Sequence, residues 1–126
     1  MENSSIIQID KLTKRFPVGK GFFTALRDID LAFGPGEFAG LVGPSGSGKT
    51  TLLNIMGSLD TPSEGTATVM GKSVAALNQK ESAALRNHHI GFIFQTFNLL
   101  PVYTVYDNVE FALLLQKLSA SQRRKA

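Results

Sequence analysis

The chain carries Gly43-Pro44-Ser45-Gly46-Ser47-Gly48-Lys49-Thr50, and no other stretch says as much about its fold. It fits G-x-x-x-x-G-K-[ST], a loop whose backbone N–H groups wrap a polyphosphate, because glycine tolerates the turns that this requires. Lys49 supplies a compact positive charge for the β- and γ-phosphates, and the Thr50 hydroxyl is a ligand for Mg²⁺. A helix expected to begin near Lys49 directs the positive end of its dipole at the same anion.

The segments on either side of the loop predict a strand before it and a helix after it. Residues 37–42 form a short apolar run that is typical of a buried strand. After the loop, apolar side chains recur at the spacing of one helix face: Leu52, Ile55, Met56 and Leu59. We expect this face to pack in the core and hold the loop in place. A glycine-rich surface turn that matches the motif by chance is disfavoured by this context.

An antiparallel β layer is predicted at the N-terminal end of the chain. Residues 6–12 and 25–33 are β-branched or alternate between apolar and polar, which is typical of strands, and turn residues at 16–21 separate them. A third strand is expected over 66–70, with a hairpin turn at 71–72.

The second half of the sequence predicts two helices and one more strand. Asn78 is followed three residues later by Glu81, a capping-box pair, and the helix that it starts is expected to run to about His88. Thr104 and Asp107 form a second such pair. Residues 90–94 predict a strand buried on both faces. Together the patterns predict an α/β fold in which a β layer flanks a strand–loop–helix unit.

Composition excludes several classes of protein. The 126 residues allow one domain with a real core, and no apolar run approaches the ~18–20 residues of a membrane helix. No cysteine is present, which excludes disulfides and thiolate metal sites and fits a reducing compartment. The net charge of +3 is too small to indicate nucleic acid as a partner. Residues 1–5 lack the basic and apolar segments of a signal peptide, and the adjacent His88 and His89 have no second cluster that would support a metal site.

A second informative stretch is Ile90-Gly91-Phe92-Ile93-Phe94-Gln95-Thr96-Phe97-Asn98-Leu99-Leu100-Pro101. It resembles the Q-loop region of ABC transporter ATP-binding subunits, and it follows Lys49 at the family's distance. Three details resemble the subgroup that serves lipoprotein release and macrolide export: Leu85-Arg86-Asn87, Asn98-Leu99-Leu100-Pro101 and Gly57-Ser58-Leu59-Asp60. The resemblance implies a P-loop NTPase core with an N-terminal antiparallel β layer. It places that core at about 1–95 and the start of a helical subdomain at about 96–126.

The resemblance also implies which residues form the site. Gln95 matches the glutamine that contacts Mg²⁺ and the attacking water, so it is the candidate catalytic residue and shares the metal with Thr50. Phe16 lies where the family places an aromatic that stacks on adenine; alternatively it is a core aromatic, with Phe22 and Phe23 as competitors. The ATP-binding set is completed by the loop and the first helical residues: Gly43, Ser45, Gly46, Ser47, Gly48, Lys49, Thr50 and Thr51.

Partners and location follow from the same resemblance. The stretch from Phe97 to Tyr106 is expected to receive a separate membrane permease, because its apolar side chains are ones that a lone protein tends to hide. The alternative is that several of them pack on the last helix. A second ATP-binding subunit would complete a dimer at the cytoplasmic, inner face of the cell membrane, where ATP binding and hydrolysis power export.

Other motifs of the family do not appear in this sequence. There is no Leu-Ser-Gly-Gly-Gln signature, no apolar strand ending in an Asp-Glu pair and no later switch histidine. The tail at 118–124 echoes the signature only superficially, since Ala120 and Ser121 replace its glycines. We therefore expect a chain that stops before the signature and the Walker B strand, binds ATP at best weakly, and hydrolyses it poorly alone. A non-catalytic nucleotide-binding fragment and another P-loop phosphotransferase remain open as alternatives.

Overall fold

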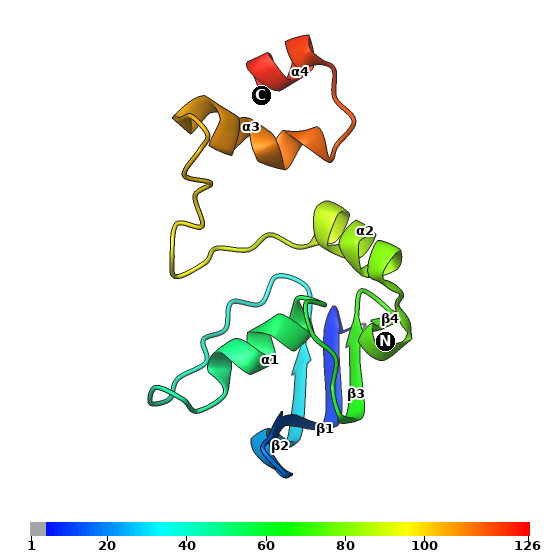
Figure 1. Cartoon of the computed structure of the whole chain (residues 1–126). Helices are drawn as coiled ribbons and strands as arrows, with labels where there is room; N and C mark the ends of the chain where they lie inside the picture. The colour runs from blue at the N-terminus through cyan, green and yellow to red at the C-terminus, as the bar shows by residue number, and fades with distance from the viewer. Residues whose placement is uncertain (1–4) are drawn as a thin grey trace. The chain divides into compact units, whose positions relative to one another are not determined.

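A computed structural model describes residues 5–126 of the chain, which divides into two compact units (Figure 1). The first unit runs to Arg86 and the second from Asn87 to Ala126. The predicted division near residue 95 stays a prediction. The prediction about a signal peptide falls largely on residues 1–4, which lie outside the described residues. From residue 5 onward, no helix has the length and apolar character needed to span a membrane.

The first unit is built on an antiparallel sheet with the strand order β2-β1-β3-β4. Its strands are β1 (Ile7–Val18), β2 (Gly21–Phe33), β3 (Glu64–Val69) and the short β4 (Lys72–Ser73). The predicted antiparallel layer is confirmed. The predicted turn at 16–21 is too wide, because Phe16 and Pro17 continue the ladder and pair with Phe23 and Phe22.

Helix α1 (Lys49–Met56) packs against β2 and β3 and closes the core (Figure 1). The predicted helix face is buried at Leu52, Ile55 and Met56. Leu59 does not belong to it, because the helix ends at Met56 and Leu59 is 45% exposed. The helix stops there because Gly57 caps it and Ser58 has a positive φ of 55°, which a helix does not continue.

An irregularity in β1 brings two backbones unusually close. Lys11 has φ 49° and interrupts the register with both neighbouring strands. Gly65 of β3, with φ +76°, lies against this bulge: a Cβ there would be 2.2 Å from the carbonyl oxygen of Lys11. The Asp30 carboxylate accepts hydrogen bonds of 2.8 Å from the Lys11 ammonium and backbone N–H, which holds the pKa of that carboxyl below its usual value. Only glycine fits position 65 without moving β1.

Two predicted strands are wrong. Residues 37–42 and 90–94 have no strand structure, and Phe38, Val42 and Ile93 are exposed. An apolar run indicates which side chains would be buried in a sheet, but a strand also needs a neighbour that pairs with its N–H and C=O groups. Within residues 5–126 no segment pairs with either run. The side chains of these runs suit a buried strand, but the pairing partner that a ladder requires is missing from the described residues.

The other regular elements of the described residues are helices. The 3₁₀ turn η1 (Val74–Ala76) leads to α2 (Gln79–His89), and the second unit holds α3 (Val105–Leu114) and α4 (Ala120–Lys125). Both predicted capping boxes are confirmed, at Asn78 with Glu81 and at Thr104 with Asp107. A third, Ser119 with Gln122, starts α4 and was not predicted.

Candidate phosphate-binding site

The loop before α1 has the backbone of an anion cradle. Gly46 and Gly48 have φ values of 77° and 93°, which side chains rarely adopt. Gly48 is the N-cap of α1, and no side chain caps the helix. In the part of the chain that the structure describes, the N–H groups of Lys49, Thr50 and Thr51 have no protein acceptor. A free first turn of this kind attracts a negatively charged ligand.

Lys49 fixes the shape of the loop from inside. Its ammonium donates to the carbonyl oxygens of Gly43 and Pro44, both at 2.7 Å, and lies 3.2 Å from the Ser47 hydroxyl. The carbonyl oxygens of Gly43 and Pro44 thus face the Lys49 ammonium. Because they point at this cation, these oxygens do not repel an anion bound in the cradle. A further bond of 3.2 Å from the N–H of Ser47 to the oxygen of Pro44 closes the turn. The loop is therefore bent and held by its own lysine.

Close packing also requires glycine at position 48, whereas the near neighbour of Gly43 is a side-chain hydroxyl that can rotate. A Cβ on Gly43 would lie 2.7 Å from the Ser47 hydroxyl. A Cβ on Gly48 would lie 2.7 Å from the carbonyl oxygen of Ala25, which belongs to β2. Gly46 meets no such neighbour, and its positive φ alone favours glycine. The motif thus anchors the start of α1 to the sheet at Gly48 and leaves the middle of the loop open.

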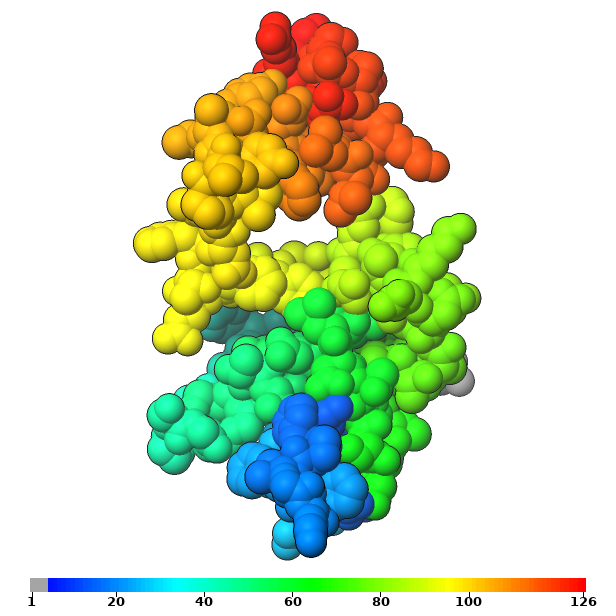
Figure 2. Space-filling model, in the orientation of Figure 1, coloured from blue at the N-terminus to red at the C-terminus, as the bar shows by residue number. Residues whose placement is uncertain are grey.

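The loop is accessible to a ligand. Ser45, Gly46, Ser47 and Thr50 are exposed, and the turquoise atoms of this segment lie at the surface of the first unit in Figure 2. Gly48, Lys49 and Thr51 are half-buried, as expected of groups that join the loop to the helix.

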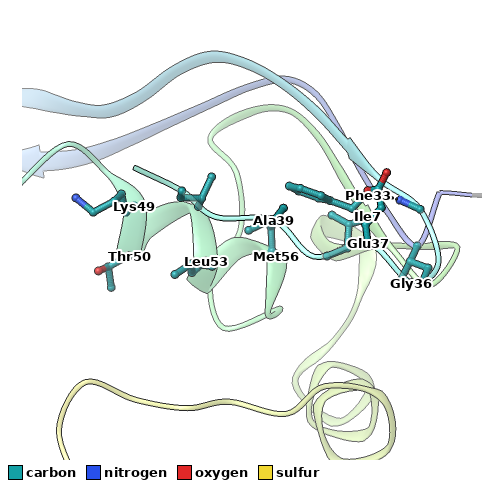
Figure 3. Close-up of a pocket in the computed structure, with 12 residues that line it drawn as sticks. Ile7, Phe33, Gly36, Glu37, Ala39, Lys49, Thr50, Leu53 and Met56 are labelled. Atoms are coloured by element: carbon teal, nitrogen blue, oxygen red, sulfur yellow. Dashed lines mark hydrogen bonds between the residues drawn. The ribbon is translucent and has the colours of Figure 1, made fainter. Parts of the chain in front are cut away.

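Next to the loop lies a cavity of 630 Å³ that sequence reasoning missed (Figure 3). Lys49 and Thr50 line one end of it, and Leu53 and Met56 continue along α1. Glu37 lines the other end, but its carboxylate already accepts the N–H of Gly34 at 2.8 Å. The remaining wall is mostly apolar: Ile6, Ile7, Phe33, Gly34, Gly36, Ala39 and Leu41. A mostly apolar wall suits apolar groups and does not suit a phosphate. The phosphate cradle therefore lies at the edge of this cavity and not inside it.

Two predicted site residues, Gln95 and Phe16, lie outside the loop in the sequence. Gln95 is exposed and lies in the second unit, so its role stays a prediction. Phe16 pairs with Phe23 near the β1–β2 turn and is 37% exposed. The Lys14 ammonium lies 5.1 Å from the centre of its ring. The stacking role of Phe16 is likewise untested.

Metal ligands are sparse in the described residues. Between residues 5 and 126 no group of three or more His, Cys, Asp or Glu side chains comes together. Thr50 places an exposed hydroxyl oxygen at the start of α1, next to the loop. This donor set fits Mg²⁺, which takes one or two protein ligands and completes its shell with phosphate oxygens and water.

The predicted partner surface in the second unit is open. Phe97, Leu99, Val102 and Tyr103 are exposed by 93%, 65%, 88% and 57%. A groove of 330 Å³ lies beside them, lined by Leu99, Leu100, Pro101, Tyr103, Val105, Asn108 and Val109. We call this the α3 groove.

Residues 26–126 match the family described as ABC transporter. The chain is 44% identical over 120 residues to the macrolide export ATP-binding/permease protein MacB of Rhodopseudomonas palustris strain BisB18. The aligned region covers 95% of this chain and 18% of that protein. It is 40% identical over 120 residues to the uncharacterized ABC transporter ATP-binding protein YknY of Bacillus subtilis strain 168, covering 95% of this chain and 52% of that relative.

Among solved structures, the dimeric post-hydrolysis state of the ATP-binding cassette MJ0796 bound to ADP and Pi is similar, with a TM-score of 0.87 and 38% identity. The match covers 94% of this chain and 53% of that chain. The chain thus spans about half the length of the B. subtilis relative and of this cassette, and 18% of the R. palustris protein.

Proposed function

The chain belongs to the ABC transporter family, and we propose that it binds MgATP at the loop 43–50 as the nucleotide-binding part of a transport ATPase. The observation that carries the proposal is the first turn of α1, where the N–H groups of Lys49, Thr50 and Thr51 have no acceptor in the described chain. A helix start with free donors, a bent glycine loop and a lysine at its centre suits a polyphosphate better than any other common ligand.

The proposal assigns separate roles to the backbone N–H groups of the loop, to Lys49 and to Phe16. The N–H groups of Ser45, Gly46, Gly48, Lys49, Thr50 and Thr51 bind the phosphate oxygens, while the N–H of Ser47 keeps its bond to the oxygen of Pro44. Lys49 keeps its loop contacts at Gly43 and Pro44 and exchanges its 3.2 Å contact with the Ser47 hydroxyl for the β- and γ-phosphates, as a compact charge on a flexible stem can do. Phe16 stacks on the adenine ring.

Thr50 and Gln95 would hold Mg²⁺ together with phosphate oxygens and water. The metal, when bound, neutralises charge that develops on the phosphates. Gln95 would also orient the water that attacks. Because the sequence holds neither a Leu-Ser-Gly-Gly-Gln signature nor an apolar strand ending in an Asp-Glu pair, we expect nucleotide binding rather than rapid turnover from the 126-residue chain by itself.

In the proposed transporter, two such ATP-binding subunits close on ATP and reopen after hydrolysis, at the cytoplasmic face of the membrane. A similar cassette forms a dimer in its solved structure. The name of the R. palustris relative joins ATP-binding and permease functions in one protein. We propose that residues 97–106 bind such a permease, because their apolar side chains are exposed.

The nucleotide site is tested by titrating the purified chain with mant-ATP and following its fluorescence, with and without Mg²⁺. We expect saturable binding that Mg²⁺ strengthens. K49A should weaken it at least about tenfold, because a charge-assisted contact is worth ~1.5–3 kcal/mol and tenfold corresponds to ~1.4 kcal/mol. T50A should remove most of the Mg²⁺ effect and retain weak binding without metal.

The matched control is K72A. Lys72 is an exposed lysine in the β3–β4 hairpin, and its replacement by alanine changes the net charge by the same amount as K49A does. K72A should bind as the unaltered chain does. A folded chain that shows no saturable binding, or a K49A variant that binds like K72A, would refute the proposal.

A further inference from the structure

The side-chain amide of Asn108 in α3 forms hydrogen bonds with the backbone of the loop that precedes this helix. Its Oδ1 accepts the N–H of Leu100 at 2.8 Å. Its Nδ2 donates to the carbonyl oxygens of Thr104 at 2.9 Å and Leu100 at 3.3 Å. The carbonyl of Tyr103 lies 3.4 Å away. A single amide thus binds both backbone groups of Leu100, as a neighbouring strand would.

This amide holds a loop that has few other restraints. Within the loop, the N–H of Tyr103 donates to the oxygen of Leu100 at 3.1 Å. The capping box of Thr104 and Asp107 fixes the start of α3, but it makes no contact with Leu100. Asn108 is therefore the link between the helix and the part of the loop that carries the exposed apolar side chains.

The α3 groove takes its shape from this link. Leu99, Leu100 and Tyr103 form its loop side, and Val105 and Val109 form its helix side. The two valines lie one turn apart on α3 and are 84% and 69% exposed, so neither packs on α4. Because the amide of Asn108 is bonded to the backbone, Tyr103 is the one lining residue whose polar side chain makes no hydrogen bond within residues 5–126.

We infer that Asn108 is the positioning residue that shapes the α3 groove to receive an apolar side chain of the membrane permease. The inference rests on the proposed function, in which residues 97–106 bind that partner. A permease is the occupant that the relatives indicate, because the name of the R. palustris protein combines it with an ATP-binding part in one chain. An apolar helix face laid into a groove between a loop and a helix is a common form of such docking.

The inference is tested with N108A, N108D and the matched control N87A in the 126-residue chain. Asn87 lies in α2, and no hydrogen bond of its side chain is found among the described residues. Amide exchange measured by NMR reports the protection of the Leu100 N–H. Biolayer interferometry reports binding to nanodiscs that contain the permease region of the R. palustris relative. Mant-ATP titration reports the loop 43–50.

We expect N108A to lower the protection of the Leu100 N–H and to weaken nanodisc binding about tenfold (~1.4 kcal/mol), with the affinity for mant-ATP unchanged. N108D keeps the side-chain shape and the acceptor for Leu100, but its carboxylate faces two carbonyl oxygens. It should therefore resemble N108A at pH 7.5 and recover protection near pH 4, where the introduced carboxyl is protonated and donates again. N87A should match the unaltered chain in every measurement.

The outcomes separate this inference from the function on which it rests. If the unaltered chain binds nanodiscs and N108A binds equally well, the positioning role is overturned and the docking surface stands. If N108A exposes the Leu100 N–H while no variant binds nanodiscs, the permease proposal fails and the inference fails with it. Unchanged protection of Leu100 in both variants would show that Asn108 does not hold the loop.

Discussion

The close approach of Gly65 to β1 gives the sharpest test of the fold, and Gly71 supplies its control. Both residues have positive φ values, +76° and +75°, so alanine carries the same backbone penalty of ~1–2 kcal/mol at either position. The neighbours differ completely. At Gly65 a Cβ would lie 2.2 Å from the oxygen and 2.4 Å from the carbon of the Lys11 carbonyl. At Gly71 it would meet nothing within 4 Å.

The difference in stability between G65A and G71A therefore isolates the steric term. Ordinary contact begins at 3.4 Å, so β1 and β3 must separate by about 1 Å, and both contacts are backbone atoms that cannot rotate away. The pairing on either side, Asp10 with Thr66 and Thr13 with Glu64, would be strained. Loss of two ladder hydrogen bonds at ~1 kcal/mol each makes G65A about 2 kcal/mol less stable than G71A.

Urea denaturation followed by far-UV circular dichroism measures this difference. Tyrosine fluorescence is unsuitable, because there is no tryptophan and both tyrosines, Tyr103 and Tyr106, lie in the second unit. In thermal melts, 2 kcal/mol corresponds to a gap of ~8–16 °C for a unit of this size. Equal stability of the two variants, within about 0.5 kcal/mol, would refute the contact between Gly65 and Lys11.

Two further predictions concern charged groups. Lys14 and Asp60 form an ion pair of 2.6 Å, and their side chains are only 12% and 32% exposed. A double-mutant cycle with K14M and D60N, measured by urea denaturation, should therefore give a coupling free energy of ~1 kcal/mol. A coupling free energy near zero would contradict this prediction. The hydrogen bonds from the Thr104 hydroxyl and N–H hold the pKa of the Asp107 carboxyl below its usual value of 3.8. Because the folded pKa is the lower one, the start of α3 is stabilised at pH values above 3.8 and loses this stabilisation as the pH falls through the depressed pKa. In T104A, carbon NMR titration should find the pKa of Asp107 closer to its usual value, and an unchanged pKa would show that Thr104 is not the cause.

The features that the sequence predicted well are those that neighbouring residues determine. A capping box needs a side chain and a backbone N–H three residues apart, so Asn78 with Glu81 and Thr104 with Asp107 could be recognised without knowing the rest of the fold. The loop 43–50 is local in the same sense, since its glycines and Lys49 bond to one another. Even so, the clash that fixes Gly48 comes from Ala25, far away in the sequence, and no local pattern could have revealed it.

The features that failed or were missed depend on partners distant in the chain. Residues 37–42 and 90–94 have the side chains of buried strands, yet a strand is a relation between two segments. The cavity beside Lys49 was missed for a similar reason, because Ile7, Phe33 and Met56 come from three separate elements. Asn108 was overlooked because an asparagine inside a helix ordinarily faces solvent, and its role depends on where Leu100 folds back.

The shape of the loop 43–50 does not depend on pairing of the segment that precedes it. The loop keeps a ligand-ready bend although residues 37–42, which lead into it, are not paired in a sheet. Its shape comes from the contacts that Lys49 makes within the loop and from the side of α1, where Gly48 packs on Ala25 and α1 packs on β2 and β3. The antiparallel layer therefore supports the proposed nucleotide site directly. It fixes the position of the first turn of α1, and the free N–H groups of that turn are the donors that we expect to bind phosphate. Substitutions that separate α1 from this layer should weaken nucleotide binding without touching a single loop residue.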